Sequence, residues 1–271
     1  MTACGQLIRP TLVKFEIETY PSSTRPALVE TDVGQGYIKG ITNQAGTCAL
    51  VSELIASELG TWFGLNIPAF AIVERCDIDI QMQIIGTRIE PPCFYSHRID
   101  GALSFDNTNL ILSKLRNKKD ISKLIIFDTW IRNSDRFFEE SSNYDNLLFS
   151  RDRETGLYLL NPIDHSHCFS DTNFLDDLPD ENCETDDRIY GMFPQFDSYL
   201  LPEAVDEALS HLRTLSRDFV EACVNQIPPQ WNATKIARKA LVDLICNRAS
   251  YVVSTISTRL LTSPGLPGIG A

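Results

Sequence analysis

The sequence predicts an α+β fold with two lobes, a small strand-rich N-lobe and a larger helical C-lobe. The first 45 residues combine alternating polar and apolar positions with a glycine-bearing turn, which is typical of strands. Beyond about residue 95, apolar residues recur at helical spacing instead. The chain has 271 residues, enough for two modest lobes with cores of their own. We therefore expect an N-lobe over 1–95, a C-lobe over 96–263 and a flexible, Gly- and Pro-rich tail over 264–271.

The expected N-lobe consists of short strands and one helix. Strands are predicted over 11–20 and 69–73, and a hairpin over 27–41 whose turn is 32–36. Apolar residues repeat at helical spacing over 47–64, which predicts a helix that stops at its terminal glycine.

The C-lobe is predicted to follow a break at Pro91 and Pro92, after which residues 93–98 are expected to form a connector. A helix over 120–133 is apolar nearly all round, which indicates a buried helix. The other expected elements are a helix over 107–116, short strands over 144–150 and 157–163, an acidic irregular segment over 171–187 and a long final helix that ends near Leu260.

Charge and composition limit the classes of partner. The net charge is −12 and the sequence pI about 4.8, so nucleic acid, which carries negative charge, is not an expected direct partner. No apolar run approaches the roughly 20 residues of a membrane span, and no signal peptide is recognisable. The eight cysteines are scattered without a Cys-x-x-Cys pair, as expected for reduced thiols in a cytoplasmic protein.

Three short motifs carry the candidate chemistry. Asn133-Ser134-Asp135-Arg136 lies at the end of the predicted buried helix, and Asn146-Leu147-Leu148 begins the next strand. Ile163-Asp164-His165 ends the strand after that. Phosphoryl transfer needs such parts, because one carboxylate orients the nucleophile's proton while an Asn oxygen and a second carboxylate hold Mg²⁺ against the phosphates.

Together these motifs resemble the catalytic and metal-binding loops of HipA-like kinases and of their relatives among the phosphoinositide kinases. The resemblance covers roughly residues 25–170. It implies a protein-kinase-like fold and an enzyme that uses ATP and Mg²⁺. It also implies that Asp135 is the catalytic base, Asn146 a metal ligand and Asp164 the principal metal ligand.

One departure from the family pattern lies between the first two motifs. Ten residues separate Asp135 from Asn146, more than is usual in the family, so the region 137–142 is expected to bulge out. Asn143 is therefore a rival metal ligand, although Asn146 directly precedes the apolar strand as the family pattern has it. The enlarged loop also keeps open the alternative of a pseudokinase, a nucleotide-binding interaction module without turnover.

The resemblance also assigns roles in the N-lobe. Lys39 ends a strand of the predicted hairpin, and the resemblance implies that it binds ATP phosphates and pairs with Glu53 of the helix. Two loops are candidate phosphate covers, one containing Gly34, Gly36 and Gly40, the other spanning 42–47 with Gly46. The sequence does not choose between them.

The segment 93–98 falls where the family places its hinge between the lobes. This position implies that backbone groups of Tyr95, Ser96 and His97 bind adenine. His165, His167 and Cys168 also suggest zinc, but no second cluster supplies the remaining ligands, so shaping of the metal loop by His165 is the favoured interpretation. Asp128 is expected to orient the backbone around Asp135.

The function predicted from these features is transfer of the γ-phosphoryl group of ATP to a Ser or Thr hydroxyl of a protein. A lipid or small-molecule kinase is a second enzyme hypothesis, which the acidic charge disfavours for anionic membranes. The acidic segment 171–187 is either a solvated loop or an attractor of basic substrates. No DNA-binding helix-turn-helix segment is recognisable, so a regulatory partner of that kind would be a separate chain.

Overall fold

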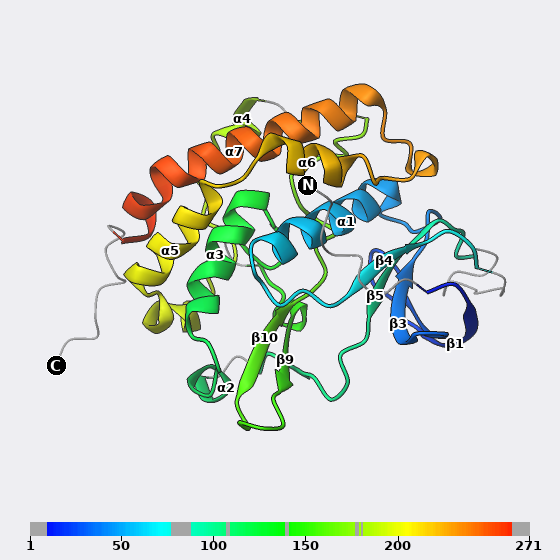
Figure 1. Cartoon of the computed structure of the whole chain (residues 1–271), viewed down its shortest axis with the longest axis horizontal. Coiled ribbons are helices and arrows are strands. Elements are labelled where there is room, and N and C mark those ends of the chain that lie inside the picture. The colour runs from blue at the N-terminus through cyan, green and yellow to red at the C-terminus, as the bar shows by residue number, and fades with distance from the viewer. Residues whose placement is uncertain are drawn as a thin grey trace.

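The computed structural model describes residues 10–76, 88–106, 109–138, 141–176, 179 and 181–261, and all structural statements below concern these residues. A strand-rich N-terminal part lies at one end of the molecule and a helical part at the other, with α1 running between them (Figure 1). The predicted α+β fold with a strand-rich N-lobe and a helical C-lobe is therefore confirmed.

The N-terminal sheet has five antiparallel strands in the order β1-β2-β3-β5-β4. Three of the predicted strand regions appear in it. The strand expected over 11–20 corresponds to β1, the hairpin over 27–41 to β2 and β3, and the strand over 69–73 to β4. The strand bounds are Val13–Thr19 for β1, Ala27–Thr31 for β2, Gly34–Lys39 for β3, Phe70–Val73 for β4 and Cys93–His97 for β5.

The segment predicted as a connector is strand β5 instead. It pairs with β3 on one side and with β4 on the other, so it lies inside the sheet. Its run Cys93, Phe94 and Tyr95 is buried, which explains why a short apolar segment after two prolines becomes a strand. The boundary expected at residue 95 thus falls within β5, and the chain leaves the sheet after His97.

Helix α1, Gly46–Trp62, confirms the predicted N-lobe helix. Every residue from Ala49 to Gly60 is buried, because the helix packs against the N-terminal sheet on one side and the C-terminal helices on the other. Glu53 is therefore enclosed by protein. Full burial of a helix leaves no polar face, and any acid on it needs a partner.

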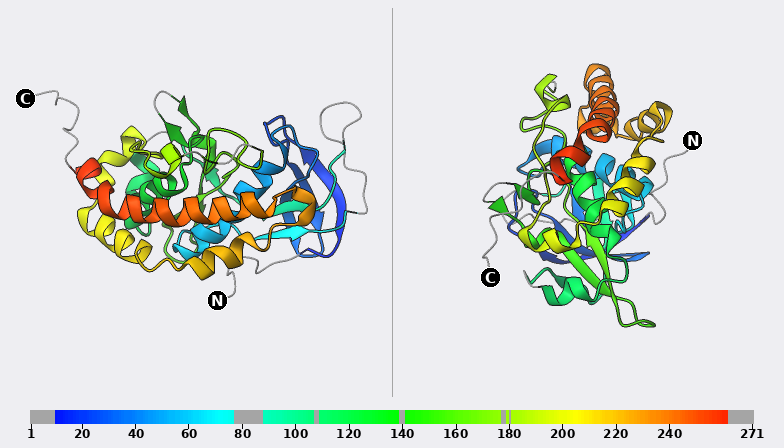
Figure 2. Two further views of the ribbon diagram at one scale, coloured as in Figure 1. Left: turned by 90° about the horizontal axis from the view of Figure 1, so that it is seen from above. Right: turned by 90° about the vertical axis from the view of Figure 1, so that its left-hand side faces the viewer.

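The C-terminal part is built around α3 and the long helix α7, which runs along most of the length of the molecule (Figure 2). Its helices are α2 (Asn109–Ser113), α3 (Lys119–Ile131), α4 (Glu181–Glu184), α5 (Pro202–Leu212), α6 (Arg217–Val224) and α7 (Lys235–Leu261). The buried helix predicted over 120–133 is α3, and the long final helix is α7; of the helix expected over 107–116, residues 107 and 108 lie outside the described part.

Two small sheets complete the C-terminal part. Strands β10 (Tyr158–Pro162), β9 (Leu147–Arg151) and β6 (Leu103–Ser104) form one of them. The region expected to bulge between Asp135 and Asn146 contributes a small hairpin, β7 (Phe137–Phe138) with β8 (Ser141–Ser142). No helix in the described ranges is both long and apolar enough to cross a membrane.

Candidate active site

A cavity of about 550 Å³ lies between the N-terminal sheet and the loops that carry Asn146 and Asp164. Strands, loops and helix α1 all contribute side chains to it. It therefore joins residues that are far apart in sequence. Its lining comprises Tyr20, Ser22, Pro26, Tyr37, Lys39, Glu53, Pro68, Phe94, Ser96, His97, Ile99, Ser104, Asn143, Asp145, Asn146, Leu148, Ile163 and Asp164.

Lys39 links the two halves of the cavity. Its Nζ forms a short ion pair with Oε1 of Glu53 and donates a second hydrogen bond to Oδ1 of Asp164 over 3.0 Å. The other oxygen of Glu53 accepts the backbone N–H of His165 over 3.1 Å. The predicted Lys39–Glu53 pair is thus present, and the same two residues also fix the loop that carries Asp164.

The charges of this group depend on one another. Burial opposes ionisation of Lys39, but the charges of Asp164 and Glu53 outweigh it and raise the lysine pKa. Burial raises the pKa of Glu53 to about 7. At Asp164 burial acts in the same direction, but Lys39 and a hydrogen bond from Ser166 (2.7 Å) hold the pKa of this carboxyl well below its usual range. Asp164 is therefore ionised and able to bind a cation.

Asp135 lies beside both candidate asparagines. Its Oδ2 accepts the side-chain amide of Asn146 over 2.9 Å and that of Asn143 over 3.2 Å. Both asparagines line the cavity. Asn146 ends a short 3₁₀ turn directly before β9, as the sequence pattern suggested, whereas Asn143 precedes that turn. The geometry brings the predicted base and both rival ligands together at the edge of the cavity.

The oxygen atoms at this site fit a hard divalent cation. Ile163 N–H donates to the backbone oxygen of Asn146 over 3.1 Å, which holds Asn146 beside the Asp164 loop. One carboxylate and one amide oxygen facing a cavity leave room for phosphate and water oxygens, the coordination that Mg²⁺ prefers. Within the ranges described, no group of three or more His, Cys, Asp or Glu side chains could hold a metal by itself.

A buried ion pair between Arg136 and Asp128 supports the loops that carry Asn146 and Asp164. Arg136 donates from Nε to Oδ2 of Asp128 over 2.7 Å, and both side chains are fully buried. Nη1 of Arg136 also bonds the backbone oxygens of Asn146 and Ile163, while the second oxygen of Asp128 accepts from Asn133 over 3.0 Å. Asp128 therefore orients the chain around Asp135, as expected from the sequence, and it does so through Arg136 and Asn133.

The loop 20–26 between β1 and β2 was missed by the sequence analysis. It contributes Tyr20, Ser22 and Pro26 to the cavity lining. Ser23 Oγ lies 3.4 Å from Nε2 of His167, so the loop reaches across to the segment after Asp164. Two prolines and two serines between predicted strands were the available signal. The loop contains no glycine, the residue on which both expected phosphate covers depended.

The glycines proposed for a phosphate cover have structural roles. A Cβ on Gly36 would lie 2.2 Å from the Tyr95 ring, and one on Gly40 would lie 2.8 Å from the backbone oxygen of Glu90. Gly46 has a φ of +74° and begins α1. In the described part of the chain, neither these residues nor Gly34 line the cavity.

Two of the residues predicted for the hinge, Ser96 and His97, contribute atoms to the cavity lining. The Tyr95 side chain packs in the cluster on the opposite face of the sheet from Ser96, because neighbouring strand residues alternate, and its hydroxyl lies 2.9 Å from Nδ1 of His97. Tyr95 and Ser96 pair with both β3 and β4, so their backbone groups belong to the sheet rather than to a hinge. The connector begins at Arg98, and the next residue, Ile99, lines the cavity.

The histidines near Asp164 support the loop. His165 is buried, and Nη2 of Arg136 lies 3.0 Å from its Nε2. Burial and the neighbouring arginine lower the pKa of His165, so the ring is neutral and accepts this bond. Cys168 is buried. These contacts agree with a role in shaping the metal loop.

Comparisons with known proteins point to one family. A family model described as HipA-like kinase matches residues 17–260. No curated protein matches the sequence. The crystal structure of a Helicobacter pylori proinflammatory kinase, CtkA, superposes with a TM-score of 0.57 at 14% identity, covering 94% of this chain and 100% of that chain. This likeness shows the fold, and the family match extends over most of the chain, so the protein belongs to the HipA-like kinase family.

Proposed function

We propose that this kinase transfers the γ-phosphoryl group of ATP to a Ser or Thr hydroxyl of a protein. The observation that carries the proposal is that Lys39, Asn146 and Asp164 line one cavity. Asp135 lies directly behind this lining, where its carboxylate accepts the side-chain amide of Asn146. A bound cation, expected to be Mg²⁺ held by Asp164 and Asn146, would neutralise charge on the phosphates. The fit of these oxygen ligands supports Mg²⁺ over softer metals.

The remaining chemistry follows from residues of the chain itself. Lys39 offers a fixed ammonium beside Asp164, placed by Glu53, and can bind phosphate oxygens without reorganisation. Asp135 accepts amide hydrogen bonds on Oδ2, which orients its carboxylate toward an incoming hydroxyl. We assign the loop 20–26 as the cover of the phosphates, because Ser22 lines the cavity and Ser23 reaches His167.

The base of the nucleotide is expected at the β5 end of the cavity. Phe94, Ile99 and Leu148 offer apolar surface there, and Ser96 and His97 offer polar atoms. Such a mixed lining suits a purine ring. Retention of Lys39, Glu53, Asp135 and Asp164 in bonded positions favours an active kinase over a pseudokinase.

A protein substrate is preferred over a lipid because the chain carries a net charge of −12, which opposes approach to anionic membranes. We propose the cytoplasm as the compartment, since the seven cysteines in the described ranges are free thiols. Any regulatory partner would be a separate chain.

The test is incubation of the purified protein with γ-labelled ATP, with and without Mg²⁺, alone and with cell lysate. Asp164→Asn serves as the inactive variant. Asp176→Asn, an exposed carboxylate whose Oδ2 accepts a local bond from Asn173, serves as the matched control. Label on a protein band, formed by the wild type and the control but not by Asp164→Asn, supports the proposal.

Two other results would contradict the proposed protein kinase activity and identify a different function. Binding of ATP without any transfer would identify a pseudokinase. Label that appears only in an organic-soluble or small-molecule fraction would identify a lipid or metabolite kinase. Acid hydrolysis of the labelled protein, followed by separation of the released phosphoserine and phosphothreonine, would establish which hydroxyl accepts the phosphoryl group.

A further inference from the structure

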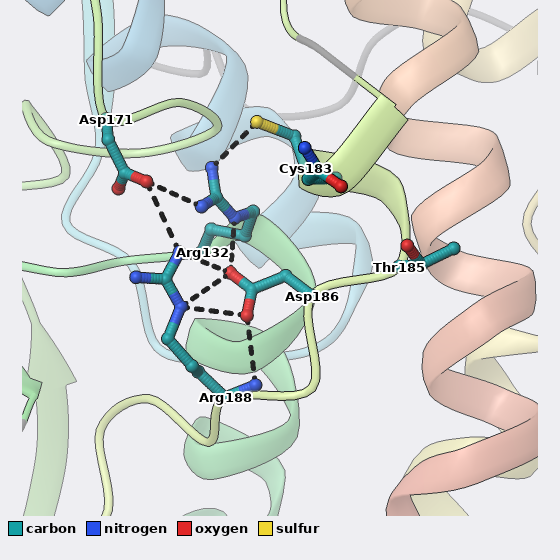
Figure 3. Close-up of a pocket in the computed structure, with 7 residues that line it drawn as sticks. Arg132, Asp171, Cys183, Thr185, Asp186 and Arg188 are labelled. Atoms are coloured by element: carbon teal, nitrogen blue, oxygen red, sulfur yellow. Dashed lines mark hydrogen bonds and ion pairs between the residues drawn. The ribbon is translucent and has the colours of Figure 1, made fainter.

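A second cavity, of about 300 Å³, lies where the end of α3 meets the segment that follows the Asp164 loop (Figure 3). Arg132, the left-handed residue that ends α3, points into it with 3% of its side chain exposed. Its Nε donates to Oδ2 of Asp186 over 2.8 Å and its Nη2 to Oδ2 of Asp171 over 2.9 Å. Its Nη1 donates to the backbone oxygen of Phe169 over 3.0 Å.

One guanidinium therefore holds two strips of chain at the two ends of the acidic segment. The upstream strip is 169–171, five to seven residues after Asp164, and it is also tied by Phe169 N–H to the Ile131 oxygen over 2.7 Å. The downstream strip is 183–190, where the Arg188 side chain adds three bonds to Asp186 and one to Asp171 (3.3 Å). The carboxylate of Asp186 also accepts the Tyr190 hydroxyl over 2.8 Å.

The downstream strip is fixed independently to the helical core. Arg248 of α7 is 1% exposed and donates to the backbone oxygen of Asp186 over 2.8 Å and to that of Thr129 in α3 over 2.8 Å. This end of the segment would stay in place without Arg132. The upstream strip begins at Phe169, whose side chain is buried in the core. Beyond Phe169, the contacts of Arg132 and Arg188 with Asp171 are polar side-chain links between this strip and the helical core.

The charges in the cavity balance. Arg132 and Arg188 supply two positive charges, and Asp171 and Asp186 supply two negative ones. Among the described residues that line this cavity, both arginines are compensated by carboxylates, so neither is left for a phosphorylated side chain. In proteins whose segments are ordered by phosphorylation, the phosphate supplies the anion for such an arginine cluster. Here Asp171 and Asp186 already occupy that position.

We propose that Arg132 and Asp171 are positioning residues whose ion pair anchors the segment after Asp164 in its substrate-binding placement without a phosphorylated residue. Arg132 lies three residues before Asp135, so the anchor connects the chain bearing the base to the chain that follows the metal loop. The consequence for substrate binding depends on the proposed function. The anchoring itself is a property of the fold.

The experiment uses Asp171→Asn, because Asp171 is 56% exposed and its loss is compatible with folding, with Asp176→Asn as the matched control in the same segment. All proteins are first treated with a general phosphatase. Backbone hydrogen exchange of residues 169–175 is then measured, followed by kcat and KM for the labelled protein substrate and for ATP. Asp171→Glu tests rescue by a retained carboxylate.

The wild type should retain its transfer rate after phosphatase treatment. In Asp171→Asn the exchange over 169–175 and the KM for the protein substrate should each rise about tenfold, the effect expected for a lost charged hydrogen bond, while KM for ATP changes little. Asp171→Glu should partly restore the exchange protection of 169–175 and the KM for the protein substrate. Asp176→Asn should match the wild type in both measurements.

Two results would overturn the proposal. One is loss of transfer activity or of exchange protection in the wild type after phosphatase treatment. The other is equal exchange in Asp171→Asn and Asp176→Asn. If the wild type transfers no phosphate at all, the proposed function fails, but the exchange comparison still decides whether the anchor exists.

Discussion

Nζ of Lys39 lies 3.0 Å from Oδ1 of Asp164, although the two residues are 125 positions apart in the chain. The contact joins the N-terminal sheet to the loop that carries Asp164 across the cavity. Glu53 completes it from α1. An ammonium held by two carboxylates is placed before any nucleotide enters, and this preorganisation is the basis of the first prediction.

Replacement of Lys39 by Met should lower kcat/KM for transfer by about 10²–10³-fold, the loss typical of one preorganised electrostatic contact. The reason is that phosphate oxygens lose their fixed cation. Lys119→Met is the control, since Lys119 pairs with Glu207 on the surface. Steady-state kinetics with labelled ATP measure both, and circular dichroism checks folding. A Lys39→Met enzyme as fast as Lys119→Met would remove Lys39 from phosphate binding.

Asp135→Asn should lower kcat by about 10²–10⁴-fold, the range of a general base, and leave ATP binding unchanged. Asparagine keeps the size of the side chain but does not accept a proton. Single-turnover transfer and nucleotide binding by calorimetry separate the two effects. Loss of nucleotide affinity with an unchanged rate constant for transfer would instead place Asp135 in ground-state binding.

The rivalry between Asn143 and Asn146 can be decided by metal titration. We expect Asn146→Ala to raise the Mg²⁺ concentration for half-maximal transfer about tenfold or more, and Asn143→Ala to change it far less. Asn146 is 5% exposed, and its backbone is tied to Ile163 beside Asp164, so its amide has the more fixed position. The reverse order of effects would make Asn143 the ligand.

Local motifs explain why the C-lobe half of this site could be located from sequence. Asp135, Asn146 and Asp164 each sit next to an apolar strand or helix, and such neighbours are visible in a short window. The predicted pairing of Lys39 with Glu53 depended on the family resemblance, because no local pattern relates a strand lysine to a helix acid. The structure provides the physical link, since α1 is buried all round and Glu53 must face a cation.

The parts that sequence did not reveal depend on tertiary arrangement. Which face of β5 bears Tyr95 is set by strand register, and Gly36 leaves the space for its ring on the face opposite the cavity. The role of loop 20–26 depends on the antiparallel pairing of β1 with β2, because the loop that connects these strands places Ser23 beside His167. Of the acidic segment, residues 177, 178 and 180 lie outside the described part, but Asp171 and Asp186 have ion-pair partners that a view of a solvated loop did not foresee.

Arg136→Leu should destabilise the protein by about 3–5 kcal/mol, because it leaves the buried carboxylate of Asp128 without its ion partner. It also removes the donor that holds Asn146 and Ile163. Arg151→Leu, at an exposed arginine, should change stability by no more than about 0.5 kcal/mol. Urea denaturation compares the two, and equal stabilities would contradict the supporting role of Arg136.

The ion pairs of Asp186 with Arg132 and Arg188 should be sensitive to acid. Burial disfavours the ionised form of Asp186, but Arg188 and Arg132 outweigh this and hold its pKa well below the usual range. In the unfolded chain an aspartate binds its proton near pH 4, so between these pKa values the unfolded state binds more protons. The contribution of Asp186 is therefore complete above about pH 5 and is lost as the pH falls through 4 and below.

Asp186→Asn tests the predicted direction of this pH dependence of stability. At pH 7 we expect it to be less stable than the wild type by about 3 kcal/mol, as for a broken buried ion pair. The difference should shrink as the pH falls from 5 to 3, because protonation then removes the same charge from the wild type. Urea denaturation at each pH gives the two curves, with Asp176→Asn following the wild type throughout. A stability difference that stays constant over this range would mean that Asp186 acts through its shape and neutral hydrogen bonds. Its charge would then contribute nothing to the free energy of unfolding.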